Sequence, residues 1–329
     1  MGTKDILVTG GSGYVGSHAC KALAQAGFVP VVLDNLHTGH RWAVQWGPFE
    51  HGDILDGACL DAVLDRVRPG GVMHFAALAC VAESFADPAA CFQTNVTGTL
   101  VLLEAMRRHA IRNLVFSSTC AVYGLAGAGI IKEDTARRPL NPYGSSKLMV
   151  ELMLEHYRRA HGLRYVALRY FNAAGADPGG AIGEHHDPET HLIPLVLDAA
   201  LGRRAHIEIF GEDYDTADGT CVRDYVHVCD IADAHVLALR HLDRNDTGAI
   251  FNLGNNHGTS VREIIALAAR VTGKAIAAKS AARRPGDAPA LVADASRIRR
   301  ELGWTPKLSA PEMIVETAWN WHRRHHRAG

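Results

Sequence analysis

The sequence predicts an α/β protein in which a doubly wound parallel sheet is followed by a smaller C-terminal α/β lobe. Its first half alternates short apolar runs with amphipathic stretches, which is the pattern of βαβ units. A cluster of glycines stands directly after the first apolar run, where a strand would turn into a helix. After about Gly175 the regular alternation stops, so we expect a second structural unit to begin there.

Five short apolar runs in the first half are the predicted strands. They span residues 6–9, 29–33, 72–75, 114–117 and 165–168. Between the first two runs, apolar residues recur every three or four positions and build one stripe of a helix. That stripe consists of Val15, Ala19, Ala22, Leu23 and Ala26. Strands separated by such helices pair in parallel, because the crossover returns the chain to the same edge of the sheet.

Two breaks mark the start of the second unit. Residues 177–180 and 187–188 carry Asp-Pro pairs and glycines that interrupt regular structure before a helical run at 195–201. We expect residues 1–175 to form the first domain and residues 176–329 the second lobe. A segment around 224–240 is a candidate to return to the first domain.

Capping signals predict two helices in the second lobe. Ser260 and Glu263 form a capping box, so a helix should begin there and continue through Val271. Asp294 can cap another helix that ends near Gly303. The last basic run, residues 322–327, is interpreted as a solvated, fraying helix end and is assigned no function.

Charge and composition exclude several classes of partner. With 34 Lys and Arg against 35 Asp and Glu, the formal net charge is -1, so no bulk field attracts nucleic acid or anionic lipid. No apolar stretch reaches membrane-spanning length, and the first residues lack the apolar region and cleavage site of a signal peptide. We expect a cytoplasmic protein with a small-molecule partner, and neither a nucleic acid nor a membrane.

The 7 cysteines are scattered along the chain, odd in number and without a C-x-x-C pair. This pattern argues against a disulfide framework and against structural zinc. We therefore expect reduced cysteines and no metal site.

The glycine cluster TGGSGYVG at residues 9–16 fits the dinucleotide-binding fingerprint. Glycines at 10, 11, 13 and 16 satisfy G-x-G-x-x-G and also the looser G-x-x-G-x-x-G. Without side chains, the backbone can approach a pyrophosphate at a helix N-terminus. Asp34 ends the second predicted strand, where a carboxylate binds the ribose 2′-hydroxyl and repels a 2′-phosphate. The sequence thus predicts a Rossmann-type domain that binds NAD rather than NADP.

Tyr143 and Lys147 are the candidate catalytic pair. They begin a predicted helix, and their four-residue spacing places phenol and ammonium one turn apart on the same face. A tyrosine of pKa about 10 is a poor base at neutral pH. A neighbouring cation and an oxidised nicotinamide would both favour the phenolate, so Tyr143 is the candidate base.

A series of motifs resembles those of the extended short-chain dehydrogenases/reductases over nearly the whole chain. In order they are TGGSGYVG, DNL, GDI, HFAA, NVTGT, FSSTCAVYG, NPYGSSK, LRYFNAAGA, DGTCVRDYVHV and RRPGD. Within that superfamily, YFNAAGA followed by IFGEDYDTADGTCVRDYVHV is similar to the UDP-galactose (UDP-glucose) 4-epimerase family.

The resemblance implies a reaction and roles for three residues. A UDP-sugar would be epimerised at carbon 4 by transient oxidation with tightly bound NAD. Tyr143 would take the proton of the 4-hydroxyl, and the 4-keto sugar would turn before receiving the hydride on its other face. Thr119 matches the family's hydroxyl beside the sugar oxygen, and Lys147 would also hold the nicotinamide ribose.

The candidate cofactor contacts come from the fingerprint and from residues that follow later strands. They are Gly10, Gly13, Tyr14, Val15, Gly16, Asp34, Asn35, Asp53, Ile54, Phe75, Ala76, Ala77, Asn95, Ser117, Tyr143, Lys147 and Tyr170.

The candidate substrate contacts follow from the same resemblance. Guanidinium groups at 223 and 284 suit a pyrophosphate, and a carboxylate at 287 suits a ribose hydroxyl. The full set is Thr119, Tyr143, Asn172, His191, Leu192, Phe210, Arg223, Arg284, Asp287 and Leu291.

Three positions depart from the family's pattern. Ala79 stands where some members carry lysine, and His191 where asparagine often contacts the nucleotide. Leu291 occupies a position linked to tolerance of N-acetylated sugars, so UDP-hexose, UDP-N-acetylhexosamine and UDP-pentose donors all stay open.

Two other functions are compatible with the same fold. Dehydratases and decarboxylases of the superfamily carry acidic residues after the active-site threonine, whereas Cys120 and Ala121 follow Thr119 here. A non-catalytic NAD-binding scaffold is disfavoured because Tyr143 and Lys147 are both present. The resemblance also implies a homodimer, with segments 89–108 and 143–161 forming a four-helix bundle.

Overall fold

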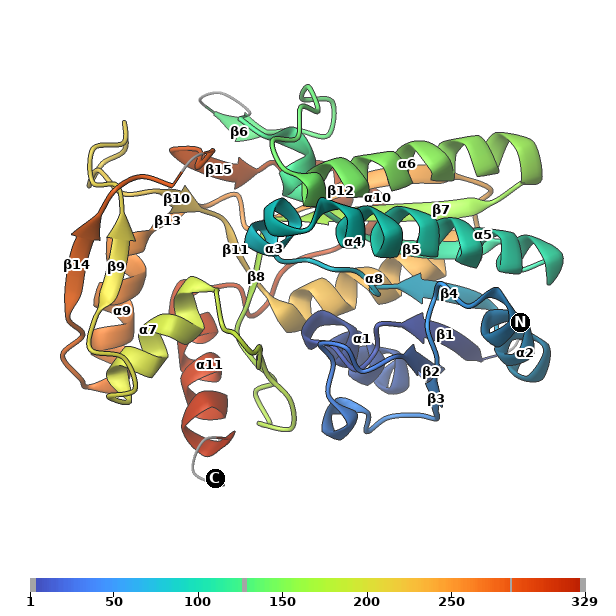
Figure 1. Ribbon diagram of the computed structural model, residues 1–329, viewed down its shortest axis with the longest axis horizontal. Helices are drawn as coiled ribbons and strands as arrows, with labels where there is room; N and C mark the ends of the chain where they lie inside the picture. The colour runs from blue at the N-terminus through green and yellow to red at the C-terminus, as the bar shows by residue number, and fades with distance from the viewer. Residues whose placement is uncertain (1–3, 126–128, 285, 326–329) are drawn as a thin grey trace.

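The computed structural model describes residues 4–125, 129–284 and 286–325, and its centre is a parallel sheet of seven strands (Figure 1). The strands are β1 (Asp5–Thr9), β2 (Val29–Asp34), β3 (Phe49–His51), β4 (Gly71–His74), β5 (Asn113–Thr119), β7 (Arg164–Tyr170) and β12 (Gly248–Leu253). Their order is β12-β7-β5-β4-β1-β2-β3. The order changes direction beside β1, and sheets of this kind bind ligands at the carboxyl ends of the strands at that point.

The predicted fold class is confirmed, and each of the five predicted strands is present. β3 and β12 are additional. β3 is a three-residue edge strand containing Glu50 and His51, so it lacks an apolar run. β12 pairs with β7 although about 80 residues of chain separate them, a long-range contact that no local pattern shows.

Helices cover both faces of the sheet (Figure 1). On one face lie α1 (Tyr14–Gln25) and α8 (Val228–Leu242), packed together and against the sheet. On the other lie α2 (Gly57–Val67), α5 (Gly98–Arg108) and α6 (Pro142–His161). Because both faces are covered, β5 is buried along its whole length, and its three consecutive apolar residues, Leu114, Val115 and Phe116, are buried on both faces of the sheet.

Shorter helical segments complete this half. α3 (Val81–Ala86) and α4 (Pro88–Phe92) lead through one π-helical stretch, Gln93–Thr97, into α5. Single 3₁₀ turns stand at Arg41–Ala43 and Cys120–Tyr123. The second of these turns follows β5 directly and places Cys120 next to Thr119.

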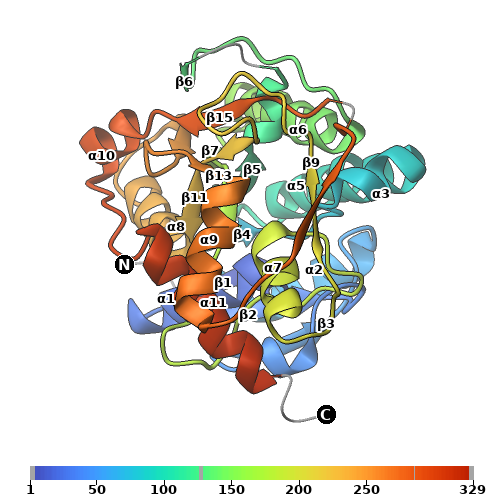
Figure 2. The same ribbon diagram turned by 90° about the vertical axis from the view of Figure 1, so that its left-hand side faces the viewer.

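The remaining elements form a smaller α/β part at one end of the sheet (Figure 2). Three helices, α7 (Leu192–Ala200), α9 (Val261–Thr272) and α11 (Pro311–His325), share a hydrophobic core. Short strands surround them: β6 (Ile130–Ile131), β8 (Asn172–Ala174), β9 (Ile207–Phe210), β10 (Val222–Arg223), β11 (Tyr225–His227), β13 (Thr259–Ser260), β14 (Ala278–Ala281) and β15 (Ala290–Ala293).

These strands form small sheets that connect the two parts. β13, β10, β15 and β6 make a four-stranded sheet, while β8 pairs with β11 and β9 with β14. β6 comes from the first half of the chain and pairs with β15 from the last part. α8 and β12, from the second half, belong to the large sheet and its helical layer.

The capping box at Ser260 and Glu263 is confirmed, and helix α9 begins there. The expected cap at Asp294 is wrong by one position. α10 (Ser296–Leu302) has Ala295 as its N-cap, and the carboxylate of Asp294 accepts a hydrogen bond from the Ser296 amide at 2.8 Å. The side chain therefore closes a turn just before the helix.

The interpretation of the last basic run as solvated is wrong for its first residue. His322 lies on α11 with 6% of its surface exposed and shares a hydrogen bond of 2.8 Å with Asp198 on α7. His325 stacks on Trp321, and residues 326–327 of the run lie outside the described residues. Packing against α7 buries His322, whereas Arg324 of the same run is exposed, so the charge pattern was misleading for the first residue.

A buried ion pair joins helix α6 to strand β7. Arg169 donates to both carboxylate oxygens of Glu151, at 2.8 and 2.6 Å, and also to the hydroxyl of Tyr123 at 2.7 Å. Ser118 of β5 donates to the same carboxylate at 2.7 Å. Both charged side chains are about 1% exposed. The pair thus fixes α6, which carries Tyr143 and Lys147, against β7 and against β5, which ends at Thr119.

Among the described residues, none of the helices combines the length and hydropathy that a membrane crossing requires.

Candidate active site

The glycine loop between β1 and α1 has the geometry of an anion cradle. Gly10 has φ of 74°, and a side chain there would collide with the backbone of Ala76. A side chain at Gly16 would collide with the carbonyl oxygen of Gly10. At Gly13, the N-cap of α1, a Cβ atom would meet only that same oxygen, at 3.4 Å. The space before the helix N-terminus therefore fits a pyrophosphate.

Asp34 lies beside this loop, as expected for a ribose-binding carboxylate. It ends β2, is 9% exposed, and accepts hydrogen bonds from the amides of Ser12 at 3.1 Å and Leu36 at 2.8 Å. Asn35 follows and donates to the carboxylate of Asp53 at 2.9 Å. The amides of Ser12 and Leu36 thus hold the Asp34 carboxylate next to the glycine loop. This arrangement suits the adenosine half of NAD.

Residues after β4 meet the glycine loop from the other side. The amides of Phe75 and Ala76 both donate to the carbonyl oxygen of Thr9, at 2.9 and 3.0 Å. The predicted contact Asn95 is 2% exposed, and its amide group is bonded to Leu78 and Ser146. Asn95 therefore fixes the loop after β4 to the start of α6, and Ala77 lies within that loop.

The predicted catalytic residues meet where β5 ends and α6 begins. Asn141 caps α6 by accepting from the amide of Gly144 at 2.7 Å, and this cap places Tyr143 and Lys147 on the first two turns. The Lys147 ammonium donates to the carbonyl oxygen of Ser117 at 3.0 Å and lies 5.9 Å from the Tyr143 ring centroid. Thr119 is the last residue of β5 and lies close enough to Tyr143 for hydrogen bonding by its hydroxyl to lower the pKa of the phenol.

Tyr170 completes this group from the neighbouring strand. Its hydroxyl lies 2.5 Å from the Ser117 hydroxyl, and the register pairs Tyr170 with Thr119. Ser117, Thr119, Tyr143, Lys147 and Tyr170 thus form one cluster at the carboxyl end of the sheet.

The protein groups around Tyr143 do not favour the phenolate by themselves. Burial raises the pKa of Tyr143 well above its usual value, Tyr170 adds to this increase, and the hydrogen bond with Thr119 opposes it. The Lys147 ammonium faces the ring and is bonded elsewhere. Lys147 alone does not overcome burial, so the lowering of the phenol pKa that the sequence predicts would need a further positive charge, such as that of an oxidised nicotinamide.

Lys147 makes stability depend on pH. Burial lowers its pKa from 10.5 to about 8, so between these values the unfolded chain binds more protons than the folded protein. The buried charge destabilises the fold below pH 8, and this penalty disappears as pH rises through the window. We expect the free energy of unfolding of the wild type, relative to Lys147→Met, to increase between pH 7.5 and 9.5. Urea unfolding of both proteins at the two pH values measures this difference in the free energy of unfolding. If the two proteins change equally with pH, Lys147 does not have the lowered pKa.

A second cluster gathers four predicted substrate contacts around Asp287. Arg223 approaches its carboxylate at 3.3 Å, and Arg284 approaches the other oxygen at 3.3 Å. The Arg284 guanidinium also lies 4.4 Å from the Phe210 ring centroid. Two cations, a carboxylate and an aromatic ring in one place can bind the phosphates, ribose and base of a nucleotide.

Arg223 connects the two clusters. Burial raises the pKa of the Cys120 thiol to about 12, and the charge of Arg223 is close enough to oppose that shift. Cys120 directly follows Thr119, so Arg223 lies toward the catalytic end of the sheet. Leu291 pairs with Arg223 across β10 and β15, while Asn172 begins β8 one residue after Phe171.

The long connection from β8 to α7 touches the first helix. Tyr14 at the start of α1 donates its hydroxyl to the carbonyl oxygen of Gly175 at 2.6 Å. Lys21 of α1 pairs with Asp177. At the other end of this connection, His191 is the N-cap of α7 and Leu192 its first residue.

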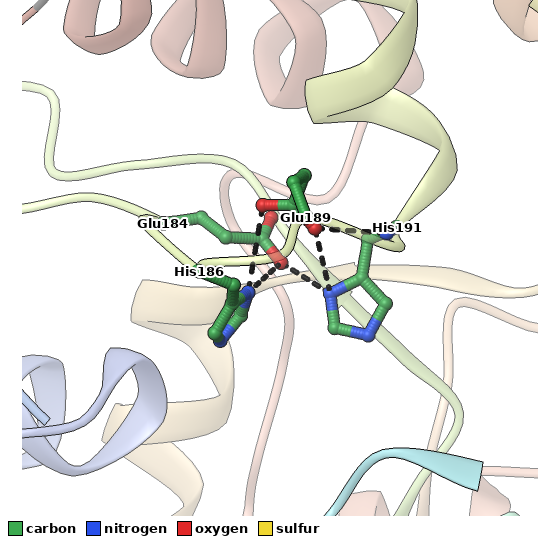
Figure 3. A group of neighbouring side chains, drawn as sticks. All are labelled: Glu184, His186, Glu189 and His191. Carbon is green, nitrogen blue, oxygen red and sulfur yellow. Dashed lines mark hydrogen bonds and ion pairs between the residues drawn. The ribbon is translucent and has the colours of Figure 1, made fainter. Parts of the chain in front are cut away.

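His191 belongs to a group of four side chains that sequence reasoning missed (Figure 3). Its ring hydrogen-bonds to Glu184, and His186 and Glu189 lie beside this pair. Burial alone would lower the pKa of His191, but the charge of Glu184 raises it to about 9. The spacing E-x-H-x-x-E-x-H at residues 184–191 is the signal that could have revealed the group.

Comparison with known proteins identifies one family. The family described as "NAD dependent epimerase/dehydratase family" matches residues 6–254. The UDP-glucose 4-epimerase of Rhizobium meliloti (strain 1021) is 50% identical over 329 residues, which is 100% of both chains.

Two solved structures extend the comparison. A UDP-glucose 4-epimerase from Brucella ovis in complex with NAD is 50% identical, with a TM-score of 0.94 over 97% of this chain and 98% of that one. A UDP-glucose 4-epimerase from Bifidobacterium longum in complex with NAD+ and UDP is 35% identical, with a TM-score of 0.94 over 99% and 100% of the two chains.

Proposed function

The chain belongs to the NAD-dependent epimerase/dehydratase family, and from this we propose that it interconverts UDP-glucose and UDP-galactose by epimerisation at carbon 4. One observation carries the chemistry. Thr119, Tyr143 and Lys147 meet at the carboxyl end of β5, with the Lys147 ammonium fixed on the Ser117 carbonyl oxygen. The glycine loop and Asp34 would hold NAD, which would supply a reversible hydride acceptor for carbon 4 of the sugar.

The protein's own groups move the proton and orient the sugar. Tyr143 accepts the proton of the 4-hydroxyl and later returns it, while Thr119 hydrogen-bonds to the same oxygen. The ammonium of Lys147 supplies a fixed positive charge beneath the Tyr143 ring. Tyr170 and Ser117, bonded to each other, hold the strand end at which these groups meet.

The nucleotide end of the substrate is assigned to the second cluster. Arg223 and Arg284 bind the diphosphate, Asp287 accepts from a ribose hydroxyl, and Phe210 packs on the uracil. His191 and the amide of Leu192 contribute at the N-terminus of α7, where an anion is stabilised. Asn172 lies toward the sugar.

Leu291 makes a second UDP-sugar substrate compatible with the site. Its side chain is of medium size and its strand position is opposite Arg223, so it neither fills the sugar site as tyrosine does nor opens it as glycine does. UDP-N-acetylglucosamine or a UDP-pentose is the alternative substrate.

The direct test incubates purified protein with UDP-glucose, UDP-N-acetylglucosamine and UDP-xylose in separate reactions without added reductant. Chromatography of the nucleotide sugars should reveal a 4-epimer with UDP-glucose, and the other two reactions measure donor range. A protein that retains NAD and leaves all three donors unchanged would exclude the proposed reaction.

We further propose that residues 1–175 together with the segment around 224–240 serve mainly to bind NAD, and that the rest of 176–329 serves mainly to bind the UDP-sugar. A cytoplasmic location is proposed because all seven cysteines are free thiols, as a reducing compartment favours.

A homodimer is proposed from the exposed apolar surface of α5 and α6. Leu100, Met149 and Leu152 are 42%, 45% and 48% exposed. Met149 and Leu152 are three residues apart, so they share one face of α6. Pairing these helices with those of a second copy would bury this surface in a four-helix bundle.

Leu152→Glu should convert the dimer to a monomer, because a charge at the centre of an apolar interface is left desolvated. Sedimentation velocity at micromolar concentration measures it. The matched control is Met313→Glu on α11, where the side chain is 36% exposed and the dimer should persist. A wild type that sediments as a monomer would overturn the assembly but not the catalytic proposal.

A further inference from the structure

Four side chains on the connection between β8 and α7 converge on one point. One ring nitrogen each of His186 and His191 and one carboxylate oxygen each of Glu184 and Glu189 all lie within 4.8 Å of one another. Figure 3 shows the two rings and two carboxylates pointing inward from a single loop. We propose that these residues bind one divalent transition-metal ion, with Zn²⁺ as the favoured ion.

The burial of the acidic groups requires a positive partner. The side chains of Glu184 and Glu189 are only 7% and 13% exposed. Two carboxylates so close together repel each other, and desolvation adds to the cost unless positive charge lies between them. The ring of His191 already pairs with Glu184. A divalent cation would displace the proton of that ring and balance both carboxylates.

His186 carries a nitrogen that no hydrogen bond uses. Its Nδ1 atom is buried and has no hydrogen-bond partner, although it lies 3.5 Å from an oxygen of Glu184 and 3.5 Å from one of Glu189. Buried ring nitrogens are normally bonded. A nitrogen directed between two carboxylates at this distance is placed as a metal ligand would be.

The donor set selects the type of ion. Two imidazole nitrogens and two carboxylate oxygens match the ligands of tetrahedral Zn²⁺, whereas Mg²⁺ prefers oxygen ligands and retains its waters. Around zinc the donor atoms lie about 3.4 Å apart, so the group must contract slightly. The loop can do this alone, since all four residues lie within residues 184–191.

The position of the group suggests what the ion does. The His186 ring lies 6.3 Å from the ring of Tyr14 on α1, and Trp321 of α11 donates to the Glu184 carbonyl oxygen at 3.1 Å. His191 caps α7. A bound ion would fix one loop against three helices from both parts of the molecule. We therefore assign it a structural role: it would fix the N-terminus of α7, which the proposed function places near the nucleotide, without touching the reacting sugar.

The experiment uses the full chain without an affinity tag, treated with a chelator and then dialysed. Titration calorimetry with ZnCl₂ should give one equivalent, and MgCl₂ should give no heat. Co²⁺ substitution should produce the visible absorption of a tetrahedral site. At a zinc concentration 100-fold above Kd, Tm should rise by about 5 °C.

Variants distinguish this site from the histidine-rich end of the chain. Glu189→Gln and His186→Gln should each weaken zinc binding at least tenfold, with unchanged far-UV circular dichroism. The control variant His325→Asn/His326→Asn should bind zinc as the wild type does, and so should Tyr143→Phe. The absence of zinc binding at 100 µM, or its loss only in the His325/His326 variant, would overturn the proposal.

Discussion

Tyr143→Phe is expected to lower kcat for epimerisation of UDP-galactose by about 10³-fold, because it removes the group that takes the proton from the 4-hydroxyl. The ring remains, so its packing near Lys147 should be kept. The protein should therefore keep its NAD and change little in Tm. Rates are measured with a coupled assay for UDP-glucose, and NAD content by release on denaturation.

A tyrosine on the same helix provides the matched control. Tyr157 also lies on α6, and its hydroxyl donates a hydrogen bond to the carboxylate of Glu104 on α5 at 2.7 Å. Tyr157→Phe loses one partly exposed hydrogen bond and should leave kcat within about twofold, since it makes no contact with the catalytic cluster. Equal losses in the two variants would contradict the role of Tyr143 as the base.

Arg169→Met should lower the free energy of unfolding by about 4 kcal/mol, the range observed when one partner of a buried ion pair is removed. It leaves the carboxylate of Glu151 on α6 buried, with the Ser118 hydroxyl as its hydrogen-bond donor. Activity should fall as well, because Glu151 and Ser118 hold α6 and β5 in register. Urea unfolding monitored by circular dichroism measures the stability.

The paired variant Glu151→Gln/Arg169→Met separates burial of a charge from loss of contact. With both charges removed, the double variant should be more stable than Arg169→Met alone, and the double-mutant cycle gives the coupling. Arg158→Met is the control, because Arg158 forms a partly exposed pair with Glu155 on the same helix and should lower the free energy of unfolding far less than Arg169→Met does. If Arg169→Met unfolds at the same urea concentration as Arg158→Met, the buried network contributes nothing.

Local patterns in the sequence predicted much of the candidate site. The strand before Gly10, the helix after it and Asp34 at the end of the next strand are separated by few residues, so their geometry follows from short-range sterics. Tyr143 and Lys147 share a helix face for the same reason. The capping box at Ser260 was likewise predicted from the sequence, whereas the cap of α10, predicted at Asp294, lies one residue later at Ala295.

Contacts between distant segments could not be derived in this way. The resemblance named Arg223, Arg284 and Asp287, but only the structure shows both guanidinium groups on one carboxylate. Strand β12 joins the first sheet from far along the chain. The burial of His322 depends on α7, which its own basic segment does not indicate.

The sequence by itself therefore determined the fold class and the cofactor and predicted the candidate catalytic pair, since each depends on residue type at short spacing. Tertiary structure decided how these groups are charged and what surrounds them. Burial raises the pKa of Tyr143. The side chain of Asn95 donates a hydrogen bond to Ser146, and the carboxylate of Glu184 hydrogen-bonds to the ring of His191. Desolvation and charge–charge interactions depend on which segments pack together, and packing between distant segments is not encoded in any local pattern.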